Sequence, residues 1–248
     1  VGKTELAKIL AGIQFGSADA MLRFDMSEFQ NKNSLPRLLG SAEAGVAGAL
    51  VDAVAEKPFS LILLDEFEKA HPDILNVFLQ VFDDGRLTSA AGRAASFEDA
   101  IIIATSNAHS DFIKAELEAG RGISEITEEL KKKLSSYFRP ELLNRFSAII
   151  IFKTLAPAHI LKIAELRLRE VAEVVRESHG IELTFSAAAI SEVSRLGYDP
   201  VFGARPLRGV ISDKIKSGLA ERILKGELKR GENWQVDFVN GEFIFNKL

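Results

Sequence analysis

The stretch LILLDEFEKA (residues 61–70) joins four consecutive apolar residues to a pair of acids, Asp65 and Glu66. A continuous apolar run is typical of a strand in a parallel sheet that helices cover on both faces. Such sheets bind ligands at the carboxyl ends of their strands. There Asp65 could hold Mg²⁺ through water and Glu66 could polarise an attacking water. The plainer interpretation is a strand end with solvated acids.

Three more apolar runs resemble buried strands, and helical patterns separate them. The runs lie at 20–25, 100–105 and 148–152. The helical stretches lie at 4–14, 71–82 and 124–138. Strands that alternate with helices predict an α/β fold with a parallel sheet.

After Phe152 the pattern changes. Amphipathic helices are predicted at 157–178, 186–197 and 205–227, a strand at 181–185 and a hairpin at 234–246. Asn240 and Gly241 predict a type I′ turn in that hairpin. We therefore expect an α/β domain over residues 1–154, incomplete at its N-terminus. A smaller α+β domain, helical with a small sheet, is expected over 155–248.

The composition excludes several classes of protein. The 248 residues carry a net charge of −4, which argues against a nucleic-acid-binding protein. The absence of cysteine excludes disulfides and thiolate zinc sites, and a reducing, cytoplasmic location fits. The four histidines are scattered and form no metal-spaced cluster. No apolar run approaches the ~20 residues of a membrane span, and Lys3, Glu5 and Lys8 interrupt any signal peptide.

The first residues, VGKTELAKIL, resemble the second half of a phosphate-binding loop. In such a loop, backbone N–H groups cradle phosphates, a lysine neutralises them and a threonine hydroxyl holds Mg²⁺. Gly2, Lys3 and Thr4 match the last positions of this motif, and the following helix directs the positive end of its dipole at the anion. Alone, Gly-Lys-Thr is a weak signal because it occurs by chance in many proteins.

Four polar side chains become candidates only together with this loop. Asn107 follows an apolar run, where an amide can bind a phosphate or water, although it is more often a turn residue. Arg139 and Arg145 flank a short helical segment, and such an arginine can stabilise phosphate charge across a subunit interface. An ordinary surface arginine is the commoner case. Arg205 opens a helix of the second domain and could reach the same phosphates.

In this order, the motifs closely resemble the second AAA+ module of the Clp unfoldases and disaggregases, of the ClpB, ClpC and ClpA kind. They are Gly2-Lys3-Thr4, FDMSEF (24–29), LILLDEFEKAHPDILNVFLQVFDDGRLT (61–88), TSN (105–107), FRPELLNRF (138–146) and GYDPVFGARPLR (197–208). The resemblance covers nearly the whole chain. It implies a P-loop AAA+ fold, Mg²⁺-dependent ATP hydrolysis and a hexameric ring that pulls polypeptides through a central pore.

The resemblance also implies which residues bind the nucleotide. Lys3 and Thr4 would contact phosphate and Mg²⁺. Asp65 would be the Mg²⁺-associated acid and Glu66 the catalytic acid. The residues expected to contact ATP are Val1, Gly2, Lys3, Thr4, Glu5, Asp65 and Arg205.

Three further roles follow from the same resemblance. Asn107 would be the first sensor, Arg145 the arginine finger that acts on a neighbouring subunit, and Arg205 the second sensor. The first half of the phosphate loop and the strand before it would precede Val1. We expect that strand centrally in the sheet, between the strands that end at Asp65 and Asn107 or close by.

One stretch departs from the family pattern. Between RLLG and ALVDAV the family carries a pore loop with an aromatic residue, whereas this chain has the shorter SAEAGVAG (41–48). Either the loop is altered, which would put threading in doubt, or residues of its tip are missing from the sequence. We favour the second interpretation because exposed loop tips are where order is usually lost.

The expected partners follow from a second sequence feature. Residues 108–137 contain no Ile/Leu-Gly-Phe/Leu tripeptide of the kind that docks a peptidase in ClpA and ClpC relatives. This favours a ClpB-like disaggregase that acts on unfolded or aggregated proteins. A co-chaperone is a candidate partner, and no peptidase, nucleic acid or membrane is expected.

Two hypotheses about function remain at this point. The first is an ATPase motor that acts on proteins, and the second is a regulatory or scaffold AAA+ protein that switches its assembly with nucleotide and threads nothing. A DNA-acting AAA+ protein is disfavoured by the acidic balance and the absence of a basic stripe.

Overall fold

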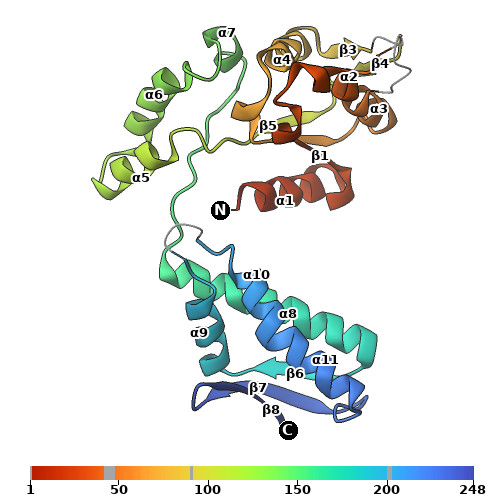
Figure 1. Ribbon diagram of the computed structural model, residues 1–248, viewed down its shortest axis with the longest axis vertical. Coiled ribbons are helices and arrows are strands. Elements are labelled where there is room, and N and C mark those ends of the chain that lie inside the picture. The colour runs from red at the N-terminus through yellow and green to blue at the C-terminus, as the bar shows by residue number, and fades with distance from the viewer. Residues whose placement is uncertain (1, 42–47, 90–91, 200–202) are drawn as a thin grey trace. The chain divides into compact units, whose positions relative to one another are not determined.

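The computed structural model describes residues 2–41, 48–89, 92–199 and 203–248 (Figure 1). They form two compact units, Gly2–Lys153 and Thr154–Leu248. Two parts of the sequence predictions, Val1 and residues 42–47 of the expected pore loop, lie outside the described residues. Each unit is built around its own sheet.

The sheet of the first unit has three parallel strands in the order β1-β2-β5. They are β1 (Met21–Asp25), β2 (Leu61–Asp65) and β5 (Ile101–Ala104). In the central strand, Leu61 and Leu63 pack against α1 (Lys3–Phe15), while Ile62 and Leu64 enter the main core on the other face. Both faces of β2 are therefore covered, as its apolar sequence predicts. The predicted α/β fold class is confirmed.

The first unit also contains further helices and a second, smaller sheet (Figure 1). The helices are α2 (Leu35–Leu39), α3 (Ala49–Glu56), α4 (Pro72–Asp84), α5 (Ser110–Glu118), α6 (Ile123–Leu134) and α7 (Pro140–Leu143). The antiparallel pair β3 (Arg86–Thr88) and β4 (Ala94–Ser96) forms a separate small sheet. Phe67, the residue after Glu66, lies at the centre of an aromatic cluster and contacts Phe78, Phe138 and Phe146.

The prediction of a strand at 148–152 is wrong. The described residues of this run form no β-ladder. Ile149 and Ile151 pack against the main core, whereas Ile150 is 70% exposed. The run thus alternates like a strand, but a strand also needs a neighbour for its backbone N–H and C=O groups. None of the three strands of the sheet pairs with it.

A further strand was expected between β2 and β5 or close by, and the first of these positions is wrong. Leu61 to Leu64 pair directly with Ile101 to Ala104 in parallel register. A ladder hydrogen-bonds only adjacent strands, so the place between β2 and β5 is filled. A further strand could join this sheet only at an edge.

The second unit is helical with a small sheet. Its helices are α8 (Pro157–His179), α9 (Ala187–Leu196), α10 (Leu207–Val210) and α11 (Ser217–Leu224). Its strands are β6 (Glu182–Phe185), β7 (Asn233–Val239) and β8 (Glu242–Lys247), in the order β6-β7-β8. The predicted hairpin is confirmed, and both turn residues, Asn240 and Gly241, have the positive φ of a type I′ turn.

The predicted helix at 205–227 differs from the structure in its interior. Regular helix begins at Leu207, and residues Ile211–Lys216 are π-helical before α11 continues. The Ser217 hydroxyl donates to the carbonyl of Ser212, five residues back, at 3.1 Å. Hydrophobic periodicity does not distinguish such wider turns from regular ones, because both keep one apolar face inward.

Candidate functional site

Four predicted site residues meet at the carboxyl edge of the first sheet. The Lys3 ammonium donates to the Ser106 carbonyl at 2.6 Å and to Asn107 Oδ1 at 2.8 Å. The Thr105 hydroxyl donates to Asp65 Oδ1, and the backbone N–H of Glu66 donates to the same hydroxyl at 3.4 Å. Lys3 and Asn107 form one set of contacts, and Asp65, Thr105 and the Glu66 backbone form a second. Both sets lie at one edge because parallel strands β2 and β5 end there.

The start of α1 has the features of an anion site. Gly2 holds φ at 95°, in the region that favours glycine. The helix begins at Lys3 and runs for 13 residues. Its first N–H groups have no partner within the helix and its dipole favours negative charge there. Thr4 lies in the first turn and is partly buried, so a lysine, a hydroxyl and the first N–H groups of the helix share one helix end.

The Asp65 carboxylate is held on both of its oxygens. Oδ1 accepts from the Thr105 hydroxyl, and Oδ2 pairs with the Arg23 guanidinium at 2.7 Å. The side chain is only 16% exposed. A hydrogen bond from each side fixes the direction of a carboxylate, so Asp65 is oriented by its neighbours rather than by solvent.

Glu66 has an unusual backbone conformation and a side chain that forms an ion pair. Its φ is 55°, a left-handed value that is uncommon outside glycine and occurs at functional sites. Its Oε2 pairs with the Lys69 ammonium at 2.5 Å. Hydrogen bonding to Glu66 raises the pKa of Lys69 above its usual value. Lys69 therefore stays charged near neutral pH and keeps a positive charge beside the Glu66 carboxylate.

The residues at this edge fit a magnesium ion that arrives with a nucleotide. Among the described residues, no group of three or more His, Cys, Asp or Glu side chains could hold a metal. Mg²⁺ commonly uses one or two protein oxygens together with substrate phosphates. The Thr4 hydroxyl and the Asp65 carboxylate are such oxygens, and the helix end beside them suits phosphate.

Two predicted arginines have no described contact with this cluster. Arg145 follows α7, is 52% exposed and pairs with Asp83 Oδ1 at 2.7 Å. No described contact joins it to Lys3 or Asp65. Arg205 is exposed and precedes α10 in the second unit. Their expected roles therefore remain predictions.

The sequence reasoning missed four side chains that hold the site. Arg23 pairs with Asp65 and Lys69 pairs with Glu66. The Thr105 hydroxyl links the Asp65 carboxylate to the Glu66 backbone N–H, and Glu68 Oε1 accepts from the Asn107 N–H at 2.9 Å. One signal was available, since Arg23 interrupts an apolar strand sequence. The others lie within motifs that were already quoted.

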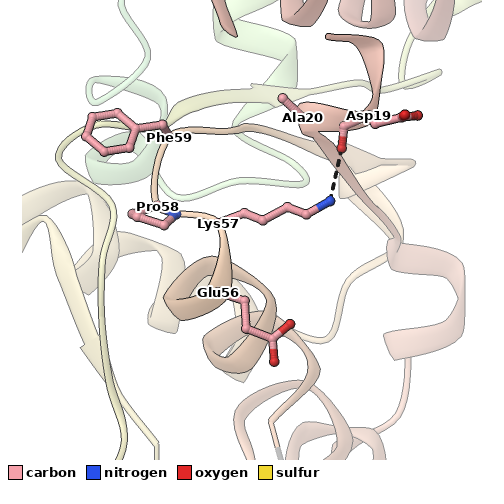
Figure 2. A pocket seen from close by; sticks show the side chains of 6 residues that line it. All are labelled: Asp19, Ala20, Glu56, Lys57, Pro58 and Phe59. Carbon is pink, nitrogen blue, oxygen red and sulfur yellow. Dashed lines mark hydrogen bonds between the residues drawn. The ribbon is translucent and has the colours of Figure 1, made fainter.

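A hollow on the opposite edge of the sheet is unrelated to this cluster (Figure 2). It lies before the first residues of β1 and β2 and is lined by Asp19, Ala20, Glu56, Lys57, Pro58 and Phe59. Lys57 Nζ donates to the Asp19 carbonyl at 3.2 Å across it, and Phe59 is 65% exposed. None of the predicted site residues lines it.

In the described part of the chain, no helix is both long and apolar enough to cross a membrane.

Two family models together match most of the chain. Residues 1–149 match the model described as "AAA domain (Cdc48 subfamily)". Residues 155–236 match "C-terminal, D2-small domain, of ClpB protein". The chain is 43% identical over 255 residues to the chaperone protein ClpB of Aquifex aeolicus (strain VF5), covering 99% of this chain and 25% of that protein.

Another relative and a solved structure agree with these models. The ATP-dependent Clp protease ATP-binding subunit ClpE of Lactococcus lactis subsp. lactis (strain IL1403) is 45% identical over 225 residues, covering 89% of this chain and 30% of that protein. A structure described as "Closed State CryoEM Reconstruction of Hsp104:ATPyS and FITC casein" superposes with a TM-score of 0.81 at 39% identity, covering 100% of this chain and 43% of that one. The predicted resemblance to a Clp AAA+ module is confirmed. The chain belongs to the AAA domain family of the Cdc48 subfamily, with the C-terminal D2-small domain of ClpB proteins after that domain.

Proposed function

We propose that this chain is the ATP-hydrolysing module of a hexameric unfoldase or disaggregase that remodels or threads polypeptides. The observation that carries the proposal is that two sets of contacts lie at one sheet edge, Lys3 with Asn107, and Asp65 with the Glu66 backbone through Thr105. Support comes from relatives named as the chaperone ClpB and from the Hsp104 structure, which was obtained with ATPyS and casein. Because the chain spans only a part of these proteins, the activity of the whole protein is inferred.

The phosphates of ATP would bind at the start of α1. The N–H groups of the first turn would donate to phosphate oxygens, and the Lys3 ammonium would neutralise them. Val1, Gly2 and Glu5 complete the expected contacts around this turn. Since Lys3 also donates to Asn107 Oδ1, the same lysine would bring the phosphate close to the Asn107 amide.

Thr4 and Asp65 would hold Mg²⁺ beside the phosphates. The ion would supply positive charge that stabilises the phosphate oxygens during transfer. Arg23 and Thr105 would keep the Asp65 carboxylate in one orientation through their contacts with its two oxygens.

Glu66 would accept a proton from the water that attacks the terminal phosphate, while the bond to the ADP oxygen breaks. The amide of Asn107 would orient that water or bind the terminal phosphate. Lys69 lies at hydrogen-bond distance from Glu66, and it would have to share or release this carboxylate when Glu66 takes the proton.

Two arginines would complete the site from elsewhere. Arg145 would act on the site of a neighbouring copy, where an arginine finger stabilises charge in the transition state. Its exposure on the first unit is compatible with this. Arg205 would contact the nucleotide from the second unit and report its state.

A reporter assay separates a motor from a nucleotide-dependent scaffold. The intact protein is mixed with a stably folded fluorescent protein that carries an unstructured tail. A motor should abolish the native fluorescence with ATP, but neither with ATPγS nor after Glu66→Gln. Nucleotide-dependent assembly that leaves the reporter folded at all ATP concentrations would favour the scaffold and refute threading.

A further inference from the structure

His109 has a strained backbone that the proposed mechanism does not use. Only three non-glycine residues of the described chain have positive φ: Glu66, His109 and Asn240. Asn240 belongs to the β7–β8 turn and Glu66 to the site. His109, at φ 56° and ψ 27°, lies two residues after Asn107 at the start of α5. A left-handed conformation is unfavourable for a non-glycine residue, so other contacts have to hold it.

The side chain of His109 supplies those contacts. Its Nε2 lies 3.0 Å from the Lys133 carbonyl, in the last turn of α6. Because a carbonyl can only accept, Nε2 carries the proton and donates. The same carbonyl also accepts from the Ser136 hydroxyl at 2.8 Å, so the imidazole joins the cap of α6. The ring also meets Tyr137 edge to face, with centroids 5.5 Å apart at 81°.

The turn that ends at His109 carries Asn107. Two acids hold the residues of this turn up to Asn107, because Asp65 accepts from the Thr105 hydroxyl and Glu68 accepts from the Asn107 N–H. Beyond Asn107, the His109 imidazole contacts the Lys133 carbonyl of α6, and Phe112, one turn further along α5, lies under the Lys133 ammonium. The imidazole is therefore the hydrogen-bonded anchor that lies nearest to Asn107 on this side of the turn.

The anchor leads back to the catalytic acid. Tyr137 contacts Phe138 at 6.4 Å between ring centroids, and Phe138 stacks on Phe67 at 5.5 Å and 20°. Phe67 follows Glu66 directly and is buried. The segment that directly follows α6 thus packs against the residue next to Glu66. Through the contact of His109 with Lys133, the Asn107 turn is attached to the same packed segment.

We propose that His109 is a positioning residue, which sets Asn107 relative to Glu66 by anchoring the Asn107 turn to the end of α6. The inference rests on the proposed function, because it assigns Asn107 and Glu66 to one reaction. It differs from a purely structural role in one respect. Loss of the imidazole should impair the reaction of bound ATP rather than ATP binding, since Lys3 and α1 keep their own contacts.

Two substitutions distinguish the effect of the imidazole from the effect of the backbone conformation at residue 109. His109→Gly accepts the positive φ without strain but removes the donor. His109→Gln keeps an N–H donor at a similar distance from the backbone and carries the same φ cost as histidine. Lys133→Met is the matched control, because it retains the Lys133 carbonyl and removes only the ammonium, which lies 4.6 Å over the Phe112 ring.

The test measures ATP turnover and amide hydrogen exchange on the intact protein and these variants. His109→Gly should lower kcat on the order of tenfold at a nearly unchanged KM for ATP, because small misplacements of catalytic groups cost such factors. Exchange at residues 107–113 should rise in the same variant. His109→Gln and Lys133→Met should stay within about threefold of the unchanged protein in both measurements.

Two results would overturn the inference. They are an unchanged kcat in His109→Gly, whatever its exchange, and a loss of kcat without faster exchange at residues 107–113. If the unchanged protein itself fails to hydrolyse ATP, the proposed function fails. The proposed role of His109 in ATP hydrolysis then fails with it. The exchange data would still show whether the imidazole of His109 holds the Asn107 turn to α6.

Discussion

Glu232, in the second unit, accepts hydrogen bonds from three different groups. It accepts from the Lys247 ammonium at 2.6 Å, the backbone N–H of Lys229 at 3.0 Å and the indole N–H of Trp234 at 3.1 Å. These bonds, led by that from Lys247, lower the pKa of Glu232 to about 2. The ionised form is thus favoured in the folded chain.

This pKa predicts the acid range in which Glu232 stops stabilising the fold. Because the folded pKa lies below the ordinary value of 4.5, the stabilisation is complete above about pH 4.5 and is lost as the pH falls toward 2. Trp234 is the single tryptophan of the chain and reports the change. The difference in its emission between the protein and Glu232→Gln should persist at pH 4 and fall to about half near pH 2. A midpoint near 4.5 would show that the three bonds do not hold in solution.

At the scale of residues, the gathering of Lys3, Asp65, Glu66 and Asn107 could be predicted from sequence. Each lies at a strand end or helix start, and parallel strands bring such positions to one edge. The pairing of Arg23 with Asp65 could not be predicted, because it depends on β1 lying beside β2 in the observed register. The left-handed backbone of Glu66 also has no signal in the residue type.

At the scale of elements, Gly197 shows why α9 ends where the sequence predicts. The helix runs to Leu196, and a Cβ on Gly197 would lie 2.2 Å from Leu207 Cδ1 and 2.9 Å from the Val193 carbonyl oxygen. The φ of −85° is ordinary for any residue, so the requirement is space rather than backbone freedom. Close packing of the end of α9 against α10 thus needs a residue without a side chain.

We therefore expect Gly197→Ala to destabilise the second unit by about 1–3 kcal/mol, the usual cost of overpacking. Gly209→Ala is the matched control. It lies within α10 and a Cβ there would meet no heavy atom within 4 Å. Since alanine is the better helix former, this change should be neutral or stabilise by up to about 1 kcal/mol. Urea titration followed by Trp234 emission measures both, and equal midpoints for the two variants would refute the packing argument.

The elements that could not be predicted depend on their neighbours. The run at 148–152 has the apolar content of a strand but lacks a hydrogen-bonding partner among the three strands of the sheet. The short pair β3–β4 was not expected, because Arg86–Thr88 and Ala94–Ser96 have no continuous apolar pattern. Long periodic helices such as α8 were predicted within one residue at the C-terminal end, since their apolar face decides their position.

At the scale of the whole molecule, the proposed ring makes each site depend on two copies. Arg145 is held by Asp83 on its own copy and is half exposed. In the proposed ring it acts on the phosphate bound by Lys3 of a neighbour. Arg145→Ala should therefore leave nucleotide affinity nearly intact while lowering hydrolysis in the ring by about 10³-fold or more.

Mixed rings test this arrangement. Arg145→Ala and Lys3→Ala subunits each lack one half of the same interface, so some interfaces in a mixture contain an intact Lys3 and an intact Arg145. Steady-state hydrolysis of mixtures should exceed that of either variant alone. Activity that stays at the level of the single variants at every mixing ratio would contradict the assignment of Arg145 to a neighbouring site.

The central claim is that Glu66 activates water for ATP hydrolysis at the carboxyl edge of the first sheet. Its most direct test compares ATP binding and single-turnover hydrolysis in the intact protein and in Glu66→Gln, with Glu128→Gln as the control. Glu128 lies on α6 with a 71% exposed side chain and pairs with Lys131. The amide keeps the shape of the carboxylate but cannot take the proton, so we expect unchanged ATP affinity and a loss of about 10²–10⁴-fold in rate. Hydrolysis by Glu66→Gln at the rate of the unchanged protein would contradict the account.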